Sequence, residues 1–406
     1  SVDDFKDDAV KAAEDVKWFP EWGKDRLQSM VKERADWCIS RQRKWGVPIP
    51  VVYCQDCGKE IIDNDIMMKV SKIFGEEGSD AWFAHDTEYF LPEGFKCPHC
   101  GSAKGFDKEK DIMDVWFDSG SSHAAVCARR KYLKVPADVY LEGADQYRGW
   151  FQSSLLTSVA GGHGAPYKQI ITHGWTVDGE GKKMSKSLGN GIAPQEIISK
   201  YGADILRLWV ASADYHADIR ISPEILKQIS DNYRKLRNTA RYCLSNLYDF
   251  DPDKDMVSNN ELEELDKYAL MKLDEVIKIA RDAFEVYDYH TAAHSLHNFC
   301  VVEMSNFYFD VLKDRLYTSA PNSKTRRAAQ TVLYKVLDAL TLVLTPILAF
   351  TADEIWQSMP HDKSRNGESP LFNEIPQPDF IEADSDFIDK WDRIHAVRFD
   401  VQKALE

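Results

Sequence analysis

Two pairs of cysteines stand at the spacing of a tetrahedral metal site. The segments CQDC (54–57) and CPHC (97–100) are both C-x2-C pairs, and a glycine follows each of them. Such turns present four thiolates to one ion and leave no open position, so the pattern predicts a structural zinc ion. Disulfide bonds are the alternative for these four cysteines, Cys54, Cys57, Cys97 and Cys100, but they require an oxidising compartment, which nothing else in the sequence indicates.

A second chemistry is suggested by the polar segment GEGKKMSKSLGNG (179–191), which sets three lysines and two serines among four glycines. Most lysine-rich loops are solvated surface segments. Ammonium groups on such a loop are also suited to binding phosphate, because glycine lets the backbone move toward a ligand and away from it. The flanking segments decide between these two interpretations.

The residues before this loop have the pattern of a strand, a helix and a second strand. ADVYL (137–141) and KQIITH (168–173) read as buried strands, and QYRGWFQSSLLTSVA (146–160) reads as the helix between them. A unit of this length has parallel strands. Ligands of open parallel sheets bind beyond the carboxyl ends of the strands, which here are EGADQ (142–146) and HGWT (173–176). The lysine-rich loop follows closely and is predicted to lie on the same side of the sheet.

Composition limits the class of protein. With 406 residues, of which 44% are apolar, the chain is long enough for roughly two to four domains. No apolar run approaches the roughly 20 residues of a membrane span, and the first residues are charged, so a cytoplasmic protein without membrane contact is expected. The net charge of −15 argues against indiscriminate binding of nucleic acid, so any such contact must be local.

The best local candidate for a nucleic-acid contact is the segment KQISDNYRKLRNTAR (227–241). Helical spacing places Arg234, Arg237 and Arg241 on one face, where they are suited to tracking phosphates. A solvated helix face is the alternative.

From about residue 224 the apolar pattern is helical throughout. A run at 326–344 is expected to end near Thr345, which would cap a further helix that starts at Pro346. Residues 359–380 read as a linker, and the last 20 or so as the start of another helix. The chain is therefore predicted to be α/β followed by an all-α bundle. Two stripes of period 3.6 are expected in its core: Leu262, Leu265, Ala269, Leu273, Val276, Ile277, Ala280 and Phe284, and then Ala293, Leu296, Cys300, Met304, Phe307 and Val311.

The segment KMSKS (183–187) resembles the second signature of the class I aminoacyl-tRNA synthetases. Four further stretches resemble the isoleucyl members of that family, and the resemblance covers essentially the whole chain. They are WCISRQRKWGVPIP (37–50), DVWFDSGSSH (114–123), LEGADQYRGWF (141–151) and ADILRLWVASADY (203–215).

The resemblance implies the second half of a Rossmann-type parallel sheet with a small zinc-binding insertion, followed by a helical anticodon-binding bundle. The implied domains are the catalytic domain at 1–50 and 111–225, the insertion at 51–110, the bundle at 226–360, and a linker with the start of a C-terminal helix at 361–406.

The resemblance also implies a reaction, in which ATP with Mg²⁺ activates L-isoleucine to isoleucyl-adenylate before transfer to tRNA(Ile). Without the family match, a tryptophan is more often plain core and His173 a strand-end residue with a hydrogen bond. The implied roles are catalysis for Lys183 and Lys186; binding of ATP and adenylate for Glu142, Gly143, Asp145, His173, Gly174 and Lys186; binding of the amino acid for Gln146, Trp116 and Trp150; and binding of tRNA for Arg234, Arg237 and Arg241.

The sequence departs from the family in one large respect. The first class I signature, H-x-G-H, is missing, because GGHGAP (161–166) does not match it. An editing insertion and a C-terminal zinc region are also missing. The chain is therefore expected to be inactive or weakly active alone and to need a separate N-terminal half. A module that only binds tRNA is the alternative to an enzyme.

Overall fold

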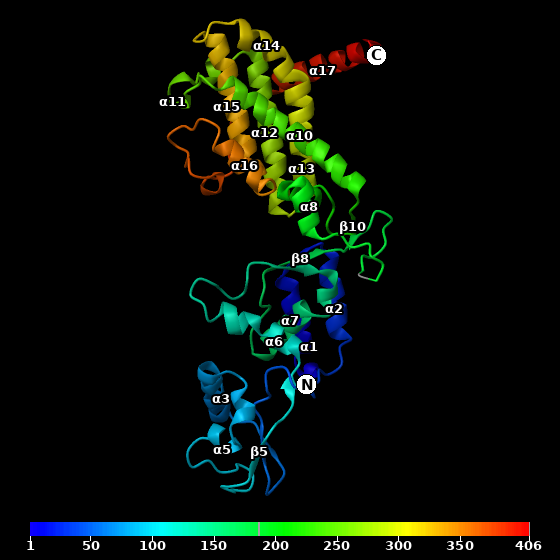
Figure 1. Ribbon diagram of the computed structural model, residues 1–406, viewed down its shortest axis with the longest axis vertical. Coiled ribbons are helices and arrows are strands. Elements are labelled where there is room, and N and C mark those ends of the chain that lie inside the picture. The colour runs from blue at the N-terminus through cyan, green and yellow to red at the C-terminus, as the bar shows by residue number, and fades with distance from the viewer. Residues whose placement is uncertain (186, 406) are drawn as a thin grey trace. The chain divides into compact units, whose positions relative to one another are not determined.

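The computed structural model describes residues 1–185 and 187–405, which form two units, Ser1–His173 and Gly174–Glu406 (Figure 1). The division falls inside the segment 111–225 that the sequence assigns to one catalytic domain. The extents of the four domains inferred from the sequence stay predictions.

The first unit contains a parallel sheet with the strand order β1-β8-β7. Helix α7 (Trp150–Ala160) connects β7 (Tyr140–Gly143) to β8 (Gln169–His173), which confirms the predicted strand, helix and strand. Strand β7 begins later than expected, since Ala137 makes only an isolated bridge. The third strand, β1 (Lys17–Phe19), pairs with β8 and was not predicted from the sequence.

Apolar side chains of the helices α1 (Lys6–Ala12), α2 (Trp22–Lys32) and α7 form the core that supports this sheet. Trp18 of β1 is buried in this core, and its ring stacks on that of Tyr147, with 6.3 Å between the ring centroids. The carboxyl ends of β7 and β8 are thereby fixed on a packed layer.

The cysteine pairs lie in an insertion with its own core. Its three-stranded antiparallel sheet has the order β4-β3-β5, and a separate two-stranded ladder, β2 with β6, joins the segments on either side of the insertion. The strands are β2 (Ser40–Arg41), β3 (Val52–Cys54), β4 (Glu60–Ile61), β5 (Phe106–Lys108) and β6 (Ile112–Met113), and the helices are α3 (Asn64–Glu77), α4 (Ala81–Ala84) and α5 (Thr87–Phe90), followed by α6 (Val115–Gly120).

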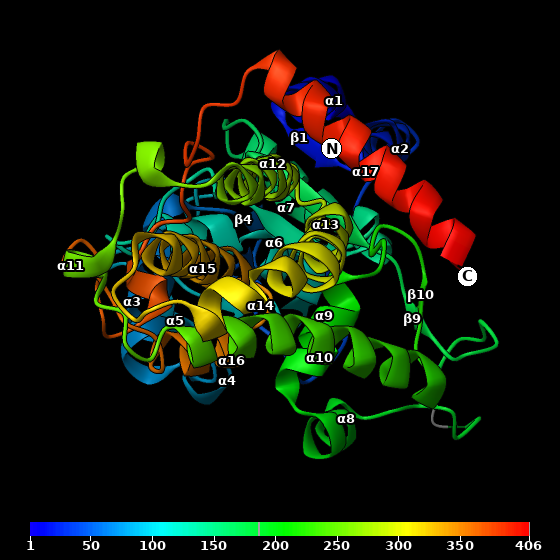
Figure 2. The same ribbon diagram turned by 90° about the horizontal axis from the view of Figure 1, so that it is seen from above.

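The second unit begins with a small parallel ladder, β9 with β10, and continues into a helical bundle. Helix α12 packs against both α13 and α15, and α15 is buried on most of its surface (Figures 1 and 2). The bounds are β9 (Thr176–Val177), α8 (Pro194–Tyr201), α9 (Ala203–Ala211), β10 (Ile219–Arg220), α10 (Pro223–Asn246), α11 (Pro252–Asp255), α12 (Glu264–Glu285), α13 (Tyr289–Asn298), α14 (Phe309–Thr318), α15 (Lys324–Leu344), α16 (Ala349–Trp356) and α17 (Ser385–Leu405).

The second apolar stripe was predicted wrongly at its end. A π-helical segment, Phe299–Tyr308, lies between α13 and α14. Because each turn of a π-helix holds more residues than an α-turn, the buried face shifts along the sequence. Tyr308 and Leu312 are buried, whereas Val311 is 50% exposed and Phe307 is only partly buried.

The predicted helix start at Pro346 was also wrong. Thr345 is the C-cap of α15 with helical backbone angles, and its hydroxyl donates a hydrogen bond to the Thr341 carbonyl, so it closes α15 and does not start the next helix. A turn follows, and α16 starts at Ala349.

The predicted linker is irregular apart from one 3₁₀ turn, Pro370–Phe372, and α17 follows it as expected. Trp391 of α17 stacks on Tyr268 of α12, with 4.5 Å between the ring centroids. Among the described residues, no helix combines the length and the apolar character that a membrane span requires.

Candidate functional site

The carboxyl ends of β7 and β8 bring several of the predicted site residues together. In the parallel register, Glu142 lies opposite Thr172 and Gly143 lies opposite His173. Glu142 is exposed, whereas Gly143 is buried. This edge therefore presents a carboxylate and an imidazole from neighbouring strands.

Gly143 lets the chain fold closely around this edge. A Cβ atom at position 143 would lie 2.8 Å from Oδ1 of Asp145 and 3.4 Å from the His173 ring. The first of these distances is shorter than real Cβ contacts, so a side chain at position 143 would displace the Asp145 carboxylate and crowd the His173 ring.

Gln146 links this edge to the start of α7. Its Oε1 accepts a hydrogen bond of 2.8 Å from the Trp150 backbone N–H, and its Nε2 donates one of 3.1 Å to Asp145. The amide is therefore oriented by two neighbours, with its N–H group toward Asp145 and its carbonyl toward the start of α7. An amide carbonyl is an acceptor suited to a substrate ammonium group.

Gly149 was not singled out by the sequence analysis, yet it lies between two predicted residues. A Cβ atom there would stand 2.4 Å from Oε1 of Gln146 and 2.9 Å from the Trp116 ring. Any side chain at position 149 would displace the Gln146 amide and the Trp116 ring from their present positions. The dipeptide Gly149-Trp150 at a helix start gave no pattern from which this packing could be read.

The ring of Trp150 is held on two sides. Its Nε1 donates to the Ser119 carbonyl at 3.0 Å, and its ring stacks on Tyr140 with a centroid distance of 3.9 Å and an interplanar angle of 9°. Tyr140, which is buried in β7, was missed because a strand tyrosine has the same appearance in sequence whether or not it supports a site.

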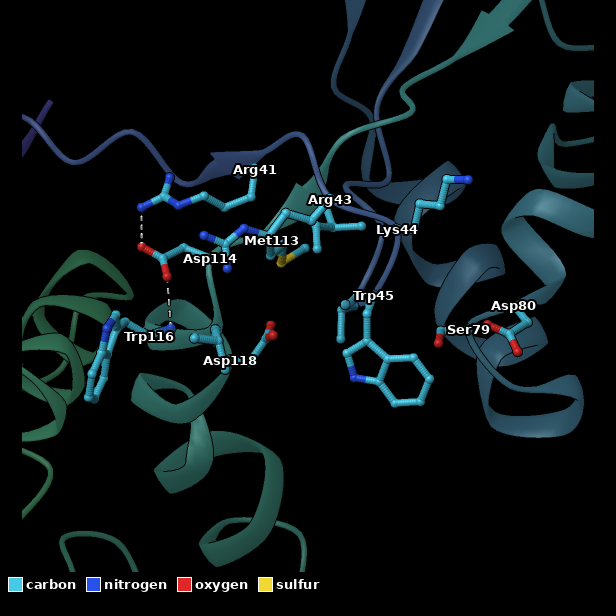
Figure 3. Close-up of a pocket in the computed structure, with 14 residues that line it drawn as sticks. Arg41, Arg43, Lys44, Trp45, Ser79, Asp80, Met113, Asp114, Trp116 and Asp118 are labelled. Atoms are coloured by element: carbon cyan, nitrogen blue, oxygen red, sulfur yellow. Dashed lines mark hydrogen bonds and ion pairs between the residues drawn. The ribbon is translucent and has the colours of Figure 1, made fainter. Parts of the chain in front are cut away.

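Trp116 is positioned by Asp114, a buried carboxylate that is 5% exposed. Asp114 caps α6 by accepting the Trp116 backbone N–H at 3.1 Å (Figure 3). It also accepts hydrogen bonds from Trp37 at 3.0 Å and from Arg41 at 2.5 Å. Trp116 itself remains 43% exposed, so its ring is available to a ligand.

Trp116 also borders a cavity of about 660 Å³ in the first unit. Arg43, Lys44, Trp45 and Asp118 are among the residues that line it, and Figure 3 shows the Trp45 ring and the Asp118 carboxylate on opposite sides. Burial raises the pKa of the Asp118 carboxyl, and the neighbouring Asp114 raises it further.

The lysine-rich loop lies in the second unit. Lys183 makes an isolated β-bridge with Val177, and its Nζ lies 5.3 Å from the centroid of the Trp175 ring. Lys186 lies outside the described residues. The predicted proximity of this loop to Glu142 and Trp150 stays a prediction.

Gly174 opens the second unit, and it too is required sterically. A Cβ atom at this position would lie 2.4 Å from the backbone of Ala217. The backbone N–H of Gly174 donates to the Tyr215 carbonyl at 2.9 Å, which fixes the chain ahead of β9.

The three predicted arginines lie on α10 and are exposed. Arg237 makes two hydrogen bonds to Glu354, at 2.6 and 2.7 Å, and this carboxylate raises the pKa of the Arg237 guanidinium. Arg234 pairs with Asp231 at 3.0 Å. A phosphate at this face would have to compete with these two carboxylates, and the contact with tRNA stays a prediction.

The four predicted cysteines form a tetrad whose ligand atoms all lie within 4.8 Å of one another. The Sγ atoms of Cys54 and Cys100 are 3.7 Å apart, and those of Cys57 and Cys97 are 3.8 Å apart. Sulfur atoms bound to one tetrahedral ion at about 2.3 Å would be about 3.8 Å apart, whereas a disulfide requires about 2.05 Å. The tetrad therefore fits a metal ion, and all four cysteines are free thiols.

Local geometry favours the thiolate form at Cys97, whereas the pKa values of the Cys57 and Cys100 thiols are raised, with burial and hydrogen bonds among the four thiols contributing. Burial raises the pKa of the Cys97 thiol, but hydrogen bonds from the backbone N–H groups of His99 and Cys100 and from neighbouring thiols outweigh it and lower this pKa to about 6. Gly58 and Gly101, which follow the two pairs, adopt positive φ angles of 70° and 78°. These are the tight turns expected from the spacing.

Comparison with known families identifies the chain. Residues 1–222 match the family model described as tRNA synthetases class I (I, L, M and V). The chain belongs to the class I tRNA synthetases. Residues 266–406 of this synthetase chain match the model for the anticodon-binding domain of tRNA ligases.

Among curated relatives, an isoleucine–tRNA ligase of Caldanaerobacter subterraneus subsp. tengcongensis is 56% identical over 406 residues, which are 100% of this synthetase chain and 43% of the relative. The ligase of Natranaerobius thermophilus is 55% identical over the same share of each chain. The chain thus spans less than half the length of these relatives.

Solved structures confirm the class I synthetase fold. A leucyl-tRNA synthetase of Agrobacterium radiobacter K84, in a ternary complex with tRNA and LeuAMS, matches with a TM-score of 0.61 and 22% identity over 85% of this chain and 42% of that chain. A methionyl-tRNA synthetase of Mycobacterium tuberculosis bound to methionyl-adenylate matches with a TM-score of 0.63 and 19% identity over 93% of this chain and 65% of that chain.

Proposed function

We propose that this chain is a portion of an isoleucine–tRNA ligase, which uses ATP with Mg²⁺ to form isoleucyl-adenylate and transfers the acyl group to tRNA(Ile) in the cytoplasm. The observation that carries the proposal is the oriented amide of Gln146, which lies between Asp145 and the start of α7 beside two tryptophans. Identity of 56% over the whole chain to isoleucine–tRNA ligases supports this assignment over a module that only binds tRNA.

In this proposal, the carbonyl of Gln146 accepts a hydrogen bond from the substrate ammonium group, and Asp145 contributes to binding of the adenylate. Trp150, held flat by Tyr140, and the exposed ring of Trp116 provide apolar surface for the isoleucine side chain. Because such surface is non-directional, shape alone would separate isoleucine from valine by only about 1–3 kcal/mol.

The adenylate would lie along the ends of β7 and β8. The exposed carboxylate of Glu142 is suited to accept hydrogen bonds from ribose hydroxyls. Gly143 leaves the end of β7 without a side chain, and the adenine is expected there beside the His173 ring. Gly174 is assigned to the same role.

Lys183 and Lys186 are assigned to the phosphates. Activation breaks the bond between the α- and β-phosphates, so negative charge grows on the departing pyrophosphate. A unit charge about 4 Å away in a medium of effective dielectric near 20 stabilises it by about 4 kcal/mol. Mg²⁺ bound to ATP would neutralise part of the same charge.

The cysteine tetrad is proposed to hold a structural Zn²⁺. Sulfur distances of 3.7 and 3.8 Å support this, as does the preference of four thiolates for zinc. The ion would stabilise the insertion and take no part in the chemistry. The exposed α10 arginines, Arg234, Arg237 and Arg241, are proposed to contact tRNA phosphates.

Pyrophosphate exchange tests the proposal. The chain supplied with the N-terminal half of the Caldanaerobacter relative is expected to exchange pyrophosphate into ATP when isoleucine is present, and the chain alone to do so weakly or not at all. The half from the relative alone is the control. If the combined protein shows no isoleucine-dependent exchange, that result would contradict the ligase proposal and favour the tRNA-binding module.

Replacing Gly149 with alanine is expected to raise the KM for isoleucine about tenfold or more in the same exchange assay, because the new methyl group would displace Gln146 and Trp116. Gly164→Ala is the matched control, since nothing lies within 4 Å of a Cβ at that position. An unchanged KM in the Gly149 variant would contradict the assignment of Gln146 and Trp116 to the amino-acid pocket.

A further inference from the structure

Two side chains at the base of the lysine-rich loop bind each other. Asp178 follows β9, and Asn190 lies beyond the KMSKS segment. The Asn190 Nδ2 donates a hydrogen bond of 2.8 Å to Oδ2 of Asp178. Both side chains are half-buried, so this contact closes the loop at its base.

Asp178 also organises the first part of the loop. Its Oδ1 accepts the backbone N–H groups of Glu180 at 3.0 Å and Lys182 at 2.8 Å. Gly181 takes a positive φ of 83° in the turn that results. The hydrogen bonds from Asn190 and the Lys182 N–H lower the pKa of the Asp178 carboxyl, so it is a carboxylate at neutral pH.

Asn190 organises the second part. Its Oδ1 accepts the Ser185 backbone N–H at 3.0 Å, and its Nδ2 also contacts the Lys183 carbonyl at 3.3 Å. Since Asp178 accepts only from the amide nitrogen, it directs the Asn190 oxygen toward Ser185. The Asn190 amide thus binds the backbone on both sides of Met184. The Met184 side chain packs against the core of the second unit.

These contacts fix the position of the backbone from which the Lys183 side chain extends. Its backbone is held by Asn190 on one side and by the bridge to Val177 on the other. The side chain itself is exposed and points over Trp175. The ammonium group can therefore move with the side-chain torsions while the backbone of Lys183 stays in place.

We propose that Asp178 and Asn190 form a clamp, that is, they are positioning residues that hold the backbone of residues 183–185, so that Lys183 reaches the phosphates of ATP from a defined place. All residues of the clamp lie in this chain, so the clamp can be tested without any assay of the ligase reaction. Its effect on catalysis rests on the proposed ligase function.

Amide hydrogen exchange on this chain tests the clamp without any assay of activity. Asn190→Ala is expected to speed exchange of the Ser185 N–H about tenfold, because it removes one hydrogen bond that protects that group. Glu180→Gln is the matched control, since within the described part of the chain the exposed Glu180 carboxylate pairs only with Lys182. An unchanged exchange rate at Ser185 would overturn the clamp.

Pyrophosphate exchange in the protein completed with the N-terminal half tests the positioning role. Asn190→Ala is expected to lower kcat about ten- to a hundredfold while the KM for isoleucine stays within about twofold, since misplaced groups cost rate and leave the amino-acid pocket intact. The double variant Asp178→Asn with Asn190→Asp restores a carboxylate–amide contact. Its kcat is therefore expected to be at least about threefold higher than the value obtained by multiplying the effects of the two single substitutions.

The outcomes separate the two proposals. Faster amide exchange with an unchanged kcat would overturn the positioning role and keep the clamp. If the unsubstituted protein shows no isoleucine-dependent exchange, the ligase proposal fails, and amide exchange at Ser185 alone decides whether the clamp exists.

Discussion

Replacing Lys186 with alanine is expected to lower the kcat of isoleucyl-adenylate formation about a hundred- to a thousandfold. Loss of one group aimed at the charge that develops in a transition state typically costs about 2.7–4 kcal/mol. Because the ammonium group is assigned to the pyrophosphate and not to the amino acid, the KM for isoleucine should change little. Pyrophosphate exchange at varied isoleucine and ATP concentrations separates the two parameters.

Lys182→Ala is the matched control for that experiment. Lys182 lies on the same loop and carries the same charge, but its ammonium group pairs with Glu180 at 2.7 Å on the surface. Its removal changes the net charge of the loop by the same amount and should leave kcat within about twofold, as expected of exposed ion pairs. Equal losses in the two variants would mean that general electrostatic attraction, and not a specific contact of Lys186, drives activation.

Replacing Cys97 with serine is expected to release the metal ion and loosen residues 51–110. Four thiolates supply the whole coordination shell of a structural site, and the binding free energy of such an ion, of the order of 10 kcal/mol, is folding free energy of the segment that it closes. Metal content per chain should fall from one equivalent toward zero, and amide exchange within the insertion should accelerate.

The helical bundle should be unaffected, because the insertion packs around a core of its own. Circular dichroism of the helices provides that check. Cys38→Ser is the matched control, since Cys38 is an exposed free thiol outside the tetrad. Retention of a full equivalent of zinc in the Cys97 variant would contradict ligation by four cysteines.

Spacing alone was sufficient for the gathering of the four cysteines and for the strand, helix and strand of the first unit. Cysteine pairs on tight turns can present their sulfurs in few ways, and β7, α7 and β8 are consecutive, so local pattern and chirality rules fix their pairing. The same pattern placed Glu142, Gly143, Asp145 and Gln146 at the end of one strand, whereas their roles were inferred from the family resemblance and stay predictions.

Contacts between distant segments could not be read in this way. Strand β1 pairs with β8, which lies about 150 residues further along the chain. A strand of three residues has too short a pattern to predict its pairing partner. Asp114 receives Trp37 and Arg41 from a segment far away in sequence, and the roles of Tyr140 and Gly149 depend on rings that only the folded chain places beside them.

The amino-acid sequence by itself determined which chemical groups this protein carries, which consecutive elements pair and where the apolar face of each regular helix begins. Tertiary structure decided the rest: the π-turn that moves burial from Val311 to Leu312, the late start of α16, and the clamp between Asp178 and Asn190. The physical reason is that periodicity reports local geometry averaged over several turns, whereas a single inserted residue or one side-chain hydrogen bond is selected by neighbours that meet only after folding.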